Sequence, residues 1–168
     1  NIAFCQRALG RYVTARRTFR RVVENPEGLA SSQLDDSKAF VAELDKLIVH
    51  VALTLDPPAA QLTVDGRPLT AVTEAGATVY VALPAGSSAA GPTDKAFNLE
   101  LDPGVHLFRA VRAGHQDAFV SRTYKPGEKT TLALHLDTLP ARISIQSEPL
   151  QAIVRVDGRE AGLAPIDI

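Results

Sequence analysis

The pattern of hydrophobic and polar positions changes its period once along the chain, near residue 48. Before this point apolar residues recur every three or four positions, as in amphipathic helices, and after it they alternate with polar residues, as in strands. The sequence therefore predicts an α+β protein in which the two kinds of structure are segregated: three N-terminal helices, or a helical hairpin, followed by a β-rich part.

The helical part consists of two stretches. The first covers residues 1–24, where Gly10 predicts a break into two helices, and it ends before the helix-stop residue Pro26. The second begins near Ser32, which suits a helix N-cap, and runs to about Leu47. Its expected apolar stripe consists of Leu34, Val41, Leu44 and Ile48, with Ala39 and Phe40 beside it.

From residue 49 onward, short alternating stretches are separated by Gly, Pro and Asp turn residues. Turn signals at about every 8–12 residues, with no helical pattern between them, favour an antiparallel β-sandwich of the Ig-like type over a parallel sheet. The expected strands are residues 49–55, 60–64, 78–83, 97–101, 105–112, 118–124 and 130–136.

A long loop at residues 84–96, rich in Gly, Pro and Ser, interrupts this rhythm. One interpretation is an inserted hairpin loop. The other is a loop that binds a partner or carries O-linked glycan, for which Ser87, Ser88 and Thr93 are the candidate residues.

The β-rich part contains an internal repeat. Residues 60–67, Ala-Gln-Leu-Thr-Val-Asp-Gly-Arg, recur at 152–159 as Ala-Ile-Val-Arg-Val-Asp-Gly-Arg. Each copy predicts a strand that ends in a tight turn, where Gly adopts a positive φ at no steric cost and Asp is favoured for local backbone reasons. We therefore interpret five residues as turn or structural residues: Asp65, Gly66, Gly104, Asp157 and Gly158.

The second copy resembles the opening of a PEGA domain. The matching pattern is Ser147, Pro149, Ala152-x-Val154-x-Val156-Asp157-Gly158 and Gly162-x-x-Pro165. The first copy is similar to the later part of the family pattern, at residues 101–106 and 113–115. The resemblance implies a first PEGA-like, Ig-like sandwich at 48–138 and the incomplete beginning of a second at 139–168. It also implies a bacterial surface protein with no defined enzymatic activity.

Residues 1–26 resemble part of a tetratricopeptide-type repeat, through Leu9-Gly10-x-Tyr12, Ala15 and Phe19. The same spacing of small and large apolar residues also occurs in other helical hairpins. The resemblance implies a tetratricopeptide-like segment at 1–47, with further repeats before it in a longer protein, because such repeats do not bury their faces alone.

The start of a second sandwich has a physical consequence. A partial sandwich leaves an apolar face and an open strand edge. Residues 141–168 are therefore expected to be disordered, to pack on the first sandwich, or to be completed by another chain through strand addition.

The charge of the chain is unevenly distributed, although its formal net charge is only −1. Arginines at four-residue spacing predict exposed basic stripes on the first helical stretch, with Arg16, Arg17, Arg20 and Arg21 as a possible partner surface. A solvated face is the alternative. With 5% aromatic residues and no Trp, nucleic acid is not an expected partner. No apolar run is long enough to predict a membrane span in this segment.

The sequence predicts no catalytic, metal-binding or cofactor-binding residues. His50, His106, His115 and His135 lack the spacing of a zinc site, and Gly-x-Ser-x-Gly, the motif of a nucleophilic serine, is absent. The expected function is a non-enzymatic, extracytoplasmic scaffold or binding module of the bacterial envelope. Its expected partners are other envelope proteins, itself, polysaccharide or O-linked glycan. The alternatives are a structural subunit of an extracellular filament and a hydrolase with an unrecognised site.

Overall fold

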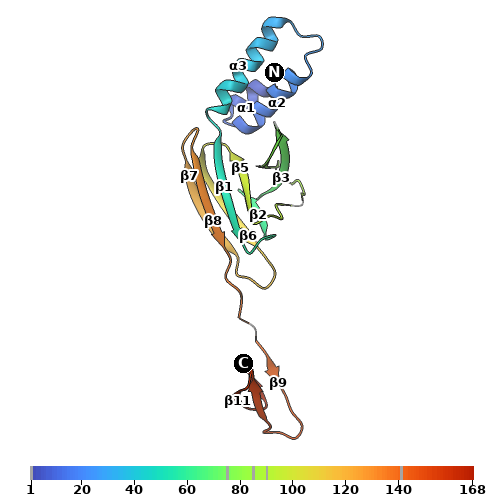
Figure 1. Cartoon of the computed structure of the whole chain (residues 1–168), viewed down its shortest axis with the longest axis vertical. Coiled ribbons are helices and arrows are strands. Elements are labelled where there is room, and N and C mark those ends of the chain that lie inside the picture. The colour runs from blue at the N-terminus through green and yellow to red at the C-terminus, as the bar shows by residue number, and fades with distance from the viewer. Residues whose placement is uncertain (1, 75, 85, 90, 141) are drawn as a thin grey trace. The chain divides into compact units, whose positions relative to one another are not determined.

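The computed structural model describes residues 2–74, 76–84, 86–89, 91–140 and 142–168. Two positions of the predicted loop, 85 and 90, lie outside the described residues. The chain forms two compact units, Asn1–Asp137 and Thr138–Ile168, and the helices and the large sheet both belong to the first (Figure 1). No helix in the described part of the chain is both long and apolar enough to span a bilayer.

Three helices form the N-terminal part of the first unit: α1 (Ile2–Ala8), α2 (Tyr12–Glu24) and α3 (Ser31–Asp45). The predicted break at Gly10 is confirmed, and this residue has a φ of 72°. The predicted N-cap at Ser32 is wrong, because Ala30 occupies that position. The Ala30 N–H donates to Oε1 of Gln33 at 3.1 Å, so a side chain in the first turn caps the backbone.

The helices pack around a small core of their own. Ala15, Phe19 and Leu44 are buried there, and the rings of Phe4 and Phe40 both contact that of Phe19. The predicted stripe on α3 is confirmed at Leu44, whereas Ala39, predicted to lie beside it, is exposed.

One large sheet forms the rest of the first unit, and its order is β7-β6-β2-β3-β4-β5-β1-β8. Most neighbours are antiparallel, but β1 pairs with β8 and β4 with β5 in parallel, and the sheet curls towards a barrel (Figure 1). The α+β class is confirmed, and the expectation of purely antiparallel pairing is wrong for these two pairs. The strands are β1 (Val49–Asp56), β2 (Gln61–Val64), β3 (Arg67–Glu74), β4 (Ala77–Ala82), β5 (Ala96–Leu101), β6 (Gly104–Val111), β7 (Ala118–Tyr124) and β8 (Lys129–His135).

Strand β3 is the one strand of this sheet that the hydrophobic pattern did not predict. Pro68 near its start argues against a strand, because proline has no N–H for the ladder. The structure places Pro68 opposite Thr63 of β2, and β3 then pairs with β4 from Leu69 to Glu74. β3 thus connects the β2 side of the sheet to the β4 side.

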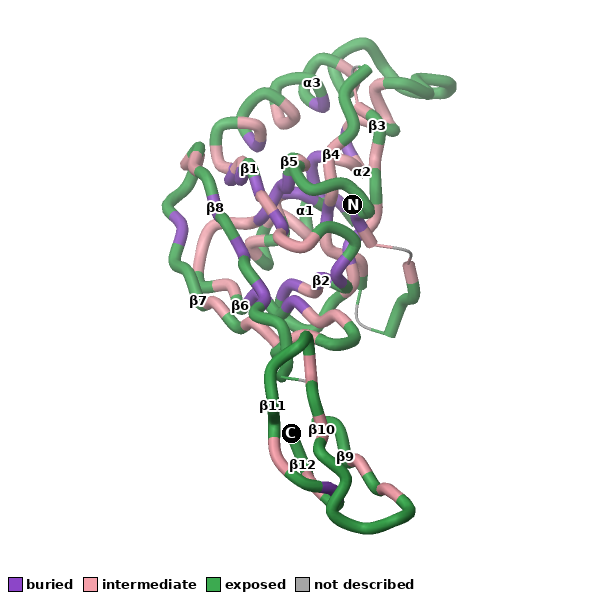
Figure 2. Tube along the Cα trace, turned by 60° about the horizontal axis from the view of Figure 1, so that its bottom comes forward, coloured by how far each residue is buried: buried purple, intermediate pink, exposed green. Residues whose placement is uncertain are grey.

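The predicted alternation is confirmed most clearly in β1. Val49, Val51, Leu53 and Leu55 are buried in the main core, whereas Ala52 between them is exposed. In Figure 2 purple, buried segments alternate with other colours along β1 and β8. The core is therefore built from the period-two positions that the sequence identifies.

A buried ion network connects the helices to the sheet. The Arg16 side chain on α2 is 2% exposed, and its guanidinium contacts Glu100 of β5, Glu74 of β3 and Asp45 of α3. Its distances to the last two carboxylates are both 2.9 Å. Arg20, one turn further along, also contacts Glu74 and Asp45. One arginine thereby joins three other elements.

The carboxylates of the network offset the cost of burying Arg16. Burial alone would lower the pKa of Arg16, but the hydrogen bond and charge of Glu100, with Glu74 and Asp45, outweigh it and hold the pKa above its ordinary value. Glu100 is itself only 6% exposed. The charges are therefore retained in the interior because they are paired and hydrogen-bonded.

This network corrects the expected exposed basic stripe. Arg16 lies in the interior and is not available to a partner, because carboxylates from three other elements surround it. Arg17 lies 3.9 Å from Glu74 at the border of the network, and Arg21 is exposed. Of the four candidate arginines, Arg21 alone is in the exposed class.

The second unit contains two small two-stranded sheets. The hairpin β10 (Ile153–Val156) and β11 (Arg159–Leu163) forms one, and β9 (Ser144–Ile145) pairs with β12 (Ile166–Asp167) in the other. Among the apolar residues of this unit that the structure describes, Ala164 alone is fully buried. The predicted beginning of a second β domain is therefore ordered as strands, with little interior.

We predict that Arg16→Leu lowers the free energy of unfolding by about 3–5 kcal/mol, because it leaves buried Glu100 unpaired. Arg16→Lys keeps the charge and loses the bidentate contact, so it is expected to lower the free energy of unfolding by a smaller amount. Arg21→Leu, on the exposed side of the same helix, should change stability by no more than about 0.5 kcal/mol. Urea unfolding followed by circular dichroism gives all three values, and equal values for Arg16→Leu and Arg21→Leu would contradict the buried role.

Candidate functional site

The two copies of the repeat form the same hairpin in different surroundings. The turn of the first copy has Asp65 at φ 53° and Gly66 at 72°, and that of the second has Asp157 at 49° and Gly158 at 79°. Ala59 and Gln151, at equivalent positions before the strands, also have positive φ. The repeat is therefore present in the backbone as well as in the sequence.

In the first copy, a third strand completes the hairpin. β2 pairs with β3 on one side and with β6 on the other, placing Leu62 opposite Ala110 and Val64 opposite Phe108. Leu62, Val64 and Phe108 are each no more than 1% exposed. The inward face of this hairpin is thus part of the main core.

The Asp65 side chain fixes β6 against this hairpin. Its Oδ1 accepts the backbone N–H of Leu107 at 2.9 Å, and its Oδ2 lies 2.7 Å from Nδ1 of His106. The Asp65 N–H in turn donates to the Leu107 carbonyl at 2.9 Å. A residue selected for its turn conformation therefore also holds the neighbouring strand in register.

The turn from β5 to β6 also holds the start of α2. The Val13 N–H donates to Oδ1 of Asp102 at 2.8 Å, and Arg11 at the N-cap makes no capping bond with its own side chain. Nε2 of His106 lies 2.7 Å from the Asp102 carbonyl oxygen. Gly104, at φ 130°, then begins β6. A distant carboxylate thus replaces the missing local cap.

In the second copy, β10 pairs with β11 alone among the described strands. Ala152 is exposed and Val154 and Val156 are half-buried, whereas their counterparts Ala60, Leu62 and Val64 are buried. Among the described residues, no strand pairs with the edge of β10 that corresponds to the edge of β2 bound by β6. Several large apolar side chains of this unit are also exposed, among them Leu150 (72%), Ile153 (60%) and Leu163 (51%) in or beside the hairpin. This open hairpin is the candidate functional site.

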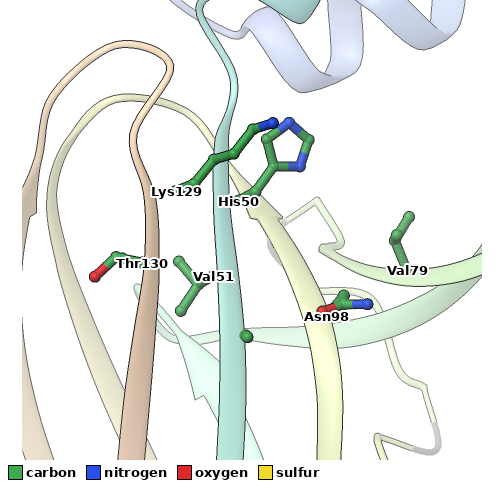
Figure 3. A pocket seen from close by; sticks show the side chains of 7 residues that line it. His50, Val51, Val79, Asn98, Lys129 and Thr130 are labelled. Carbon is green, nitrogen blue, oxygen red and sulfur yellow. The ribbon is translucent and has the colours of Figure 1, made fainter.

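Among the hollows lined by described residues of the first unit, two are considered further. One, of about 350 Å³, is lined by Ala52, Asn98 and five other residues, and Figure 3 shows the side chains of His50 and Lys129 close together, with Val79 on the other side of Asn98. The other, of about 450 Å³, lies among the helices and is lined by Phe4, Phe19 and other apolar residues. Both are open surface features without a cluster of reactive groups among their described lining residues.

The remaining candidate residues lie apart from the hairpin in sequence. Ser87, Ser88 and Thr93 are exposed in the described parts of their loop. His135 contacts Asp56 at 3.1 Å. Within the described ranges, no group of three or more His, Cys, Asp or Glu side chains is arranged to hold a metal ion.

Comparisons with known proteins leave the family of the chain open. No family model matches it, and a search of curated proteins found no match. Among solved structures, it is similar to "The Bacillus anthracis TIE protein", with 13% sequence identity and a TM-score of 0.34. The alignment covers 73% of this chain and 26% of that chain, so the chain spans about a quarter of that protein. A similarity of this extent carries no argument about fold or function.

We predict that Asp102→Asn makes stability less dependent on pH. Burial raises the pKa of Asp102 above its ordinary value, although bonds from Val13 and Tyr12 oppose the shift. Its stabilising contribution is therefore present below about pH 4, the ordinary aspartate range, and is lost as the pH rises through the raised pKa. The wild-type free energy of unfolding minus that of the variant should fall between pH 4 and pH 7 in urea titrations. A difference that grows with pH would contradict a raised pKa of Asp102 in the folded state.

The two turn aspartates provide a matched pair of variants. Asp65→Asn should destabilise the first hairpin by about 1–2 kcal/mol, because it removes the charge that accepts from Leu107 and His106. Asp157→Asn, which keeps the turn preference and disturbs no described strand, should cost at most about 0.5 kcal/mol. Urea titration followed by NMR at the Gly66 and Gly158 amides measures each hairpin separately. Equal losses at both sites would show that the turn alone sets the cost.

Proposed function

We propose that this chain is a non-enzymatic binding and assembly module of the bacterial cell envelope, acting outside the cytoplasm, with PEGA-type, Ig-like β domains and tetratricopeptide-like helices. The PEGA-like pattern of the repeat supports the class. The observation that carries the proposal is the contrast between the two hairpins: Ala60, Leu62 and Val64 of the first copy are buried, whereas their counterparts Ala152, Val154 and Val156 in the second are exposed or half-buried.

The first unit is suited to act as a support. Its helices are tied to the sheet by Arg16 and Asp102, which connect α2 to β3, β5 and the turn after β5. Contacts that join several elements oppose the bending of one element against another. We therefore assign the contact role to the second unit and the supporting role to the first.

A structural subunit of an extracellular filament is the second candidate. The open edge of β10 favours it, because head-to-tail strand addition between identical subunits builds open filaments when the rotation does not close. Negative-stain microscopy of native material distinguishes the two candidates. Regular filaments support the subunit, whereas particles that stay monodisperse at all concentrations support the binding module.

Photo-cross-linking in the native host tests the proposal. A photoreactive residue at Arg155, on the open strand, is expected to give adducts with envelope proteins, in cells whose fractionation places the chain outside the cytoplasm. The matched control is the same residue at Thr63, the equivalent position of β2, which already faces Arg109 of β6. It should give few intermolecular adducts. A cytoplasmic location, or equal adducts from both positions, would refute the proposal.

A further inference from the structure

The helices cover part of one face of the sheet. Val81 of β4 is buried against Val13 of α2, and Glu100, which pairs with Val81, is also buried. Two residues before Glu100 on the same face of β5, Asn98 is exposed, and so is its partner Ala52 on β1. The hollow of about 350 Å³ therefore lies where the cover of the helices ends.

Lys129 and His50 lie together at one end of this hollow. They are partners in the parallel register of β8 and β1, and Figure 3 shows their side chains close to one another. Nδ1 of His50 lies 3.6 Å from Oε1 of Glu100, but that carboxylate is already paired with Arg16. The ion pairs of the described residues leave the Lys129 ammonium without a carboxylate. A charged donor thus faces the hollow with its hydrogen bonds unused.

Further lysines are present at the same junction. The turn that holds Lys125 meets the end of α3 beside Lys46, where the Gly127 N–H donates to the carbonyl of the residue after Lys46 at 3.0 Å. Both lysines are exposed, and Glu128 is the acidic residue of the turn. Together with Lys129 they give this end of the sheet a net positive charge, which attracts anions.

We propose that this hollow binds the carboxylate or phosphate group of an anionic sugar. The Lys129 ammonium donates charge-assisted hydrogen bonds to the anionic oxygens, with the imidazole of His50 beside it. The amide of Asn98 can donate and accept, which suits sugar hydroxyl groups, and the small side chain of Ala52 leaves room for the ring. This site belongs to the first unit, so it does not depend on the contact role assigned to the second.

The test is a titration of the full 168-residue chain with D-galacturonate, galactose 6-phosphate and polygalacturonate, with uncharged galactose as the reference. We expect saturable NMR shifts at the Asn98 and Lys129 amides with the three acids and none with galactose. Lys129→Gln should weaken binding about tenfold or more, because it removes a charge-assisted hydrogen bond. Ala52→Leu should abolish binding, because its larger side chain fills the hollow from an exposed position.

Two control variants separate the hollow from its surroundings. Lys125→Gln removes the same charge from the turn, and Ala133→Leu enlarges an exposed alanine of β8 that does not line the hollow. Both should stay within about twofold of the wild-type affinity at physiological salt, which screens exposed charges. Circular dichroism checks that each variant is folded.

Three results would overturn the proposal: no saturable shift with any of the acids, equal losses for Lys125→Gln and Lys129→Gln, or binding that survives Ala52→Leu. Equal losses for the two lysines would show that a diffuse charge, and not the hollow, attracts the anion. Where the site binds, the two forms of galacturonate identify its source. Equal affinity per sugar supports a free sugar as the ligand, and tighter binding of the polymer supports a polysaccharide.

Discussion

The arrangement of the first unit depends on a desolvated arginine. Arg16 is on a helix, and the carboxylates that surround it belong to a second helix and two strands. A buried charge without partners costs several kcal/mol, so the guanidinium is tolerated where all these elements meet correctly and is costly elsewhere. The helices must therefore pack on the sheet where Glu74 and Glu100 lie together, because both carboxylates are needed to pair with Arg16.

Two further contacts act at the same junction, and each joins residues distant in sequence. Asp102 caps the start of α2 from the turn after β5. The turn between β7 and β8 meets the end of α3, where the Gly127 N–H donates to the Leu47 carbonyl at 3.0 Å. A Cβ at Gly127 would lie 2.5 Å from the Lys46 carbonyl oxygen, so this approach requires glycine. Loops of the sheet therefore hold the start of α2 and the end of α3. Leu44 and Ile48, which are buried, add apolar packing at this junction.

The sequence predicted the features that depend on neighbouring residues. It did not predict those that depend on contacts with residues distant in the chain. The alternation of Val49, Val51, Leu53 and Leu55 predicted β1, and Gly10 predicted the break between α1 and α2. The spacing of Arg16 and Arg20 indicated only a helix face, because no periodicity reveals that carboxylates from β3 and β5 will face it. Glu100 offered no signal either, because a charged residue between Leu99 and Leu101 is what an alternating strand with one solvated face predicts, and its burial is seen in the structure alone. For β3, Pro68 is tolerated because it lies at the start of the strand, where it pairs with β2, and the ladder with β4 begins only at Leu69.

The repeated hairpin shows the same difference between local conformation and long-range pairing within one sequence motif. Val-Asp-Gly-Arg gives the same turn in both copies, because a positive φ at Asp and Gly is a local property of those residues. Burial of the strand before the turn is not local, and it differs between the copies according to whether a third strand is present. Asp65 contributes to both the turn and the pairing, since it lies in the turn and its carboxylate accepts a hydrogen bond from Leu107 of β6. Asp157 adopts the same turn conformation, and among the described residues no strand accompanies its hairpin as β6 accompanies the first.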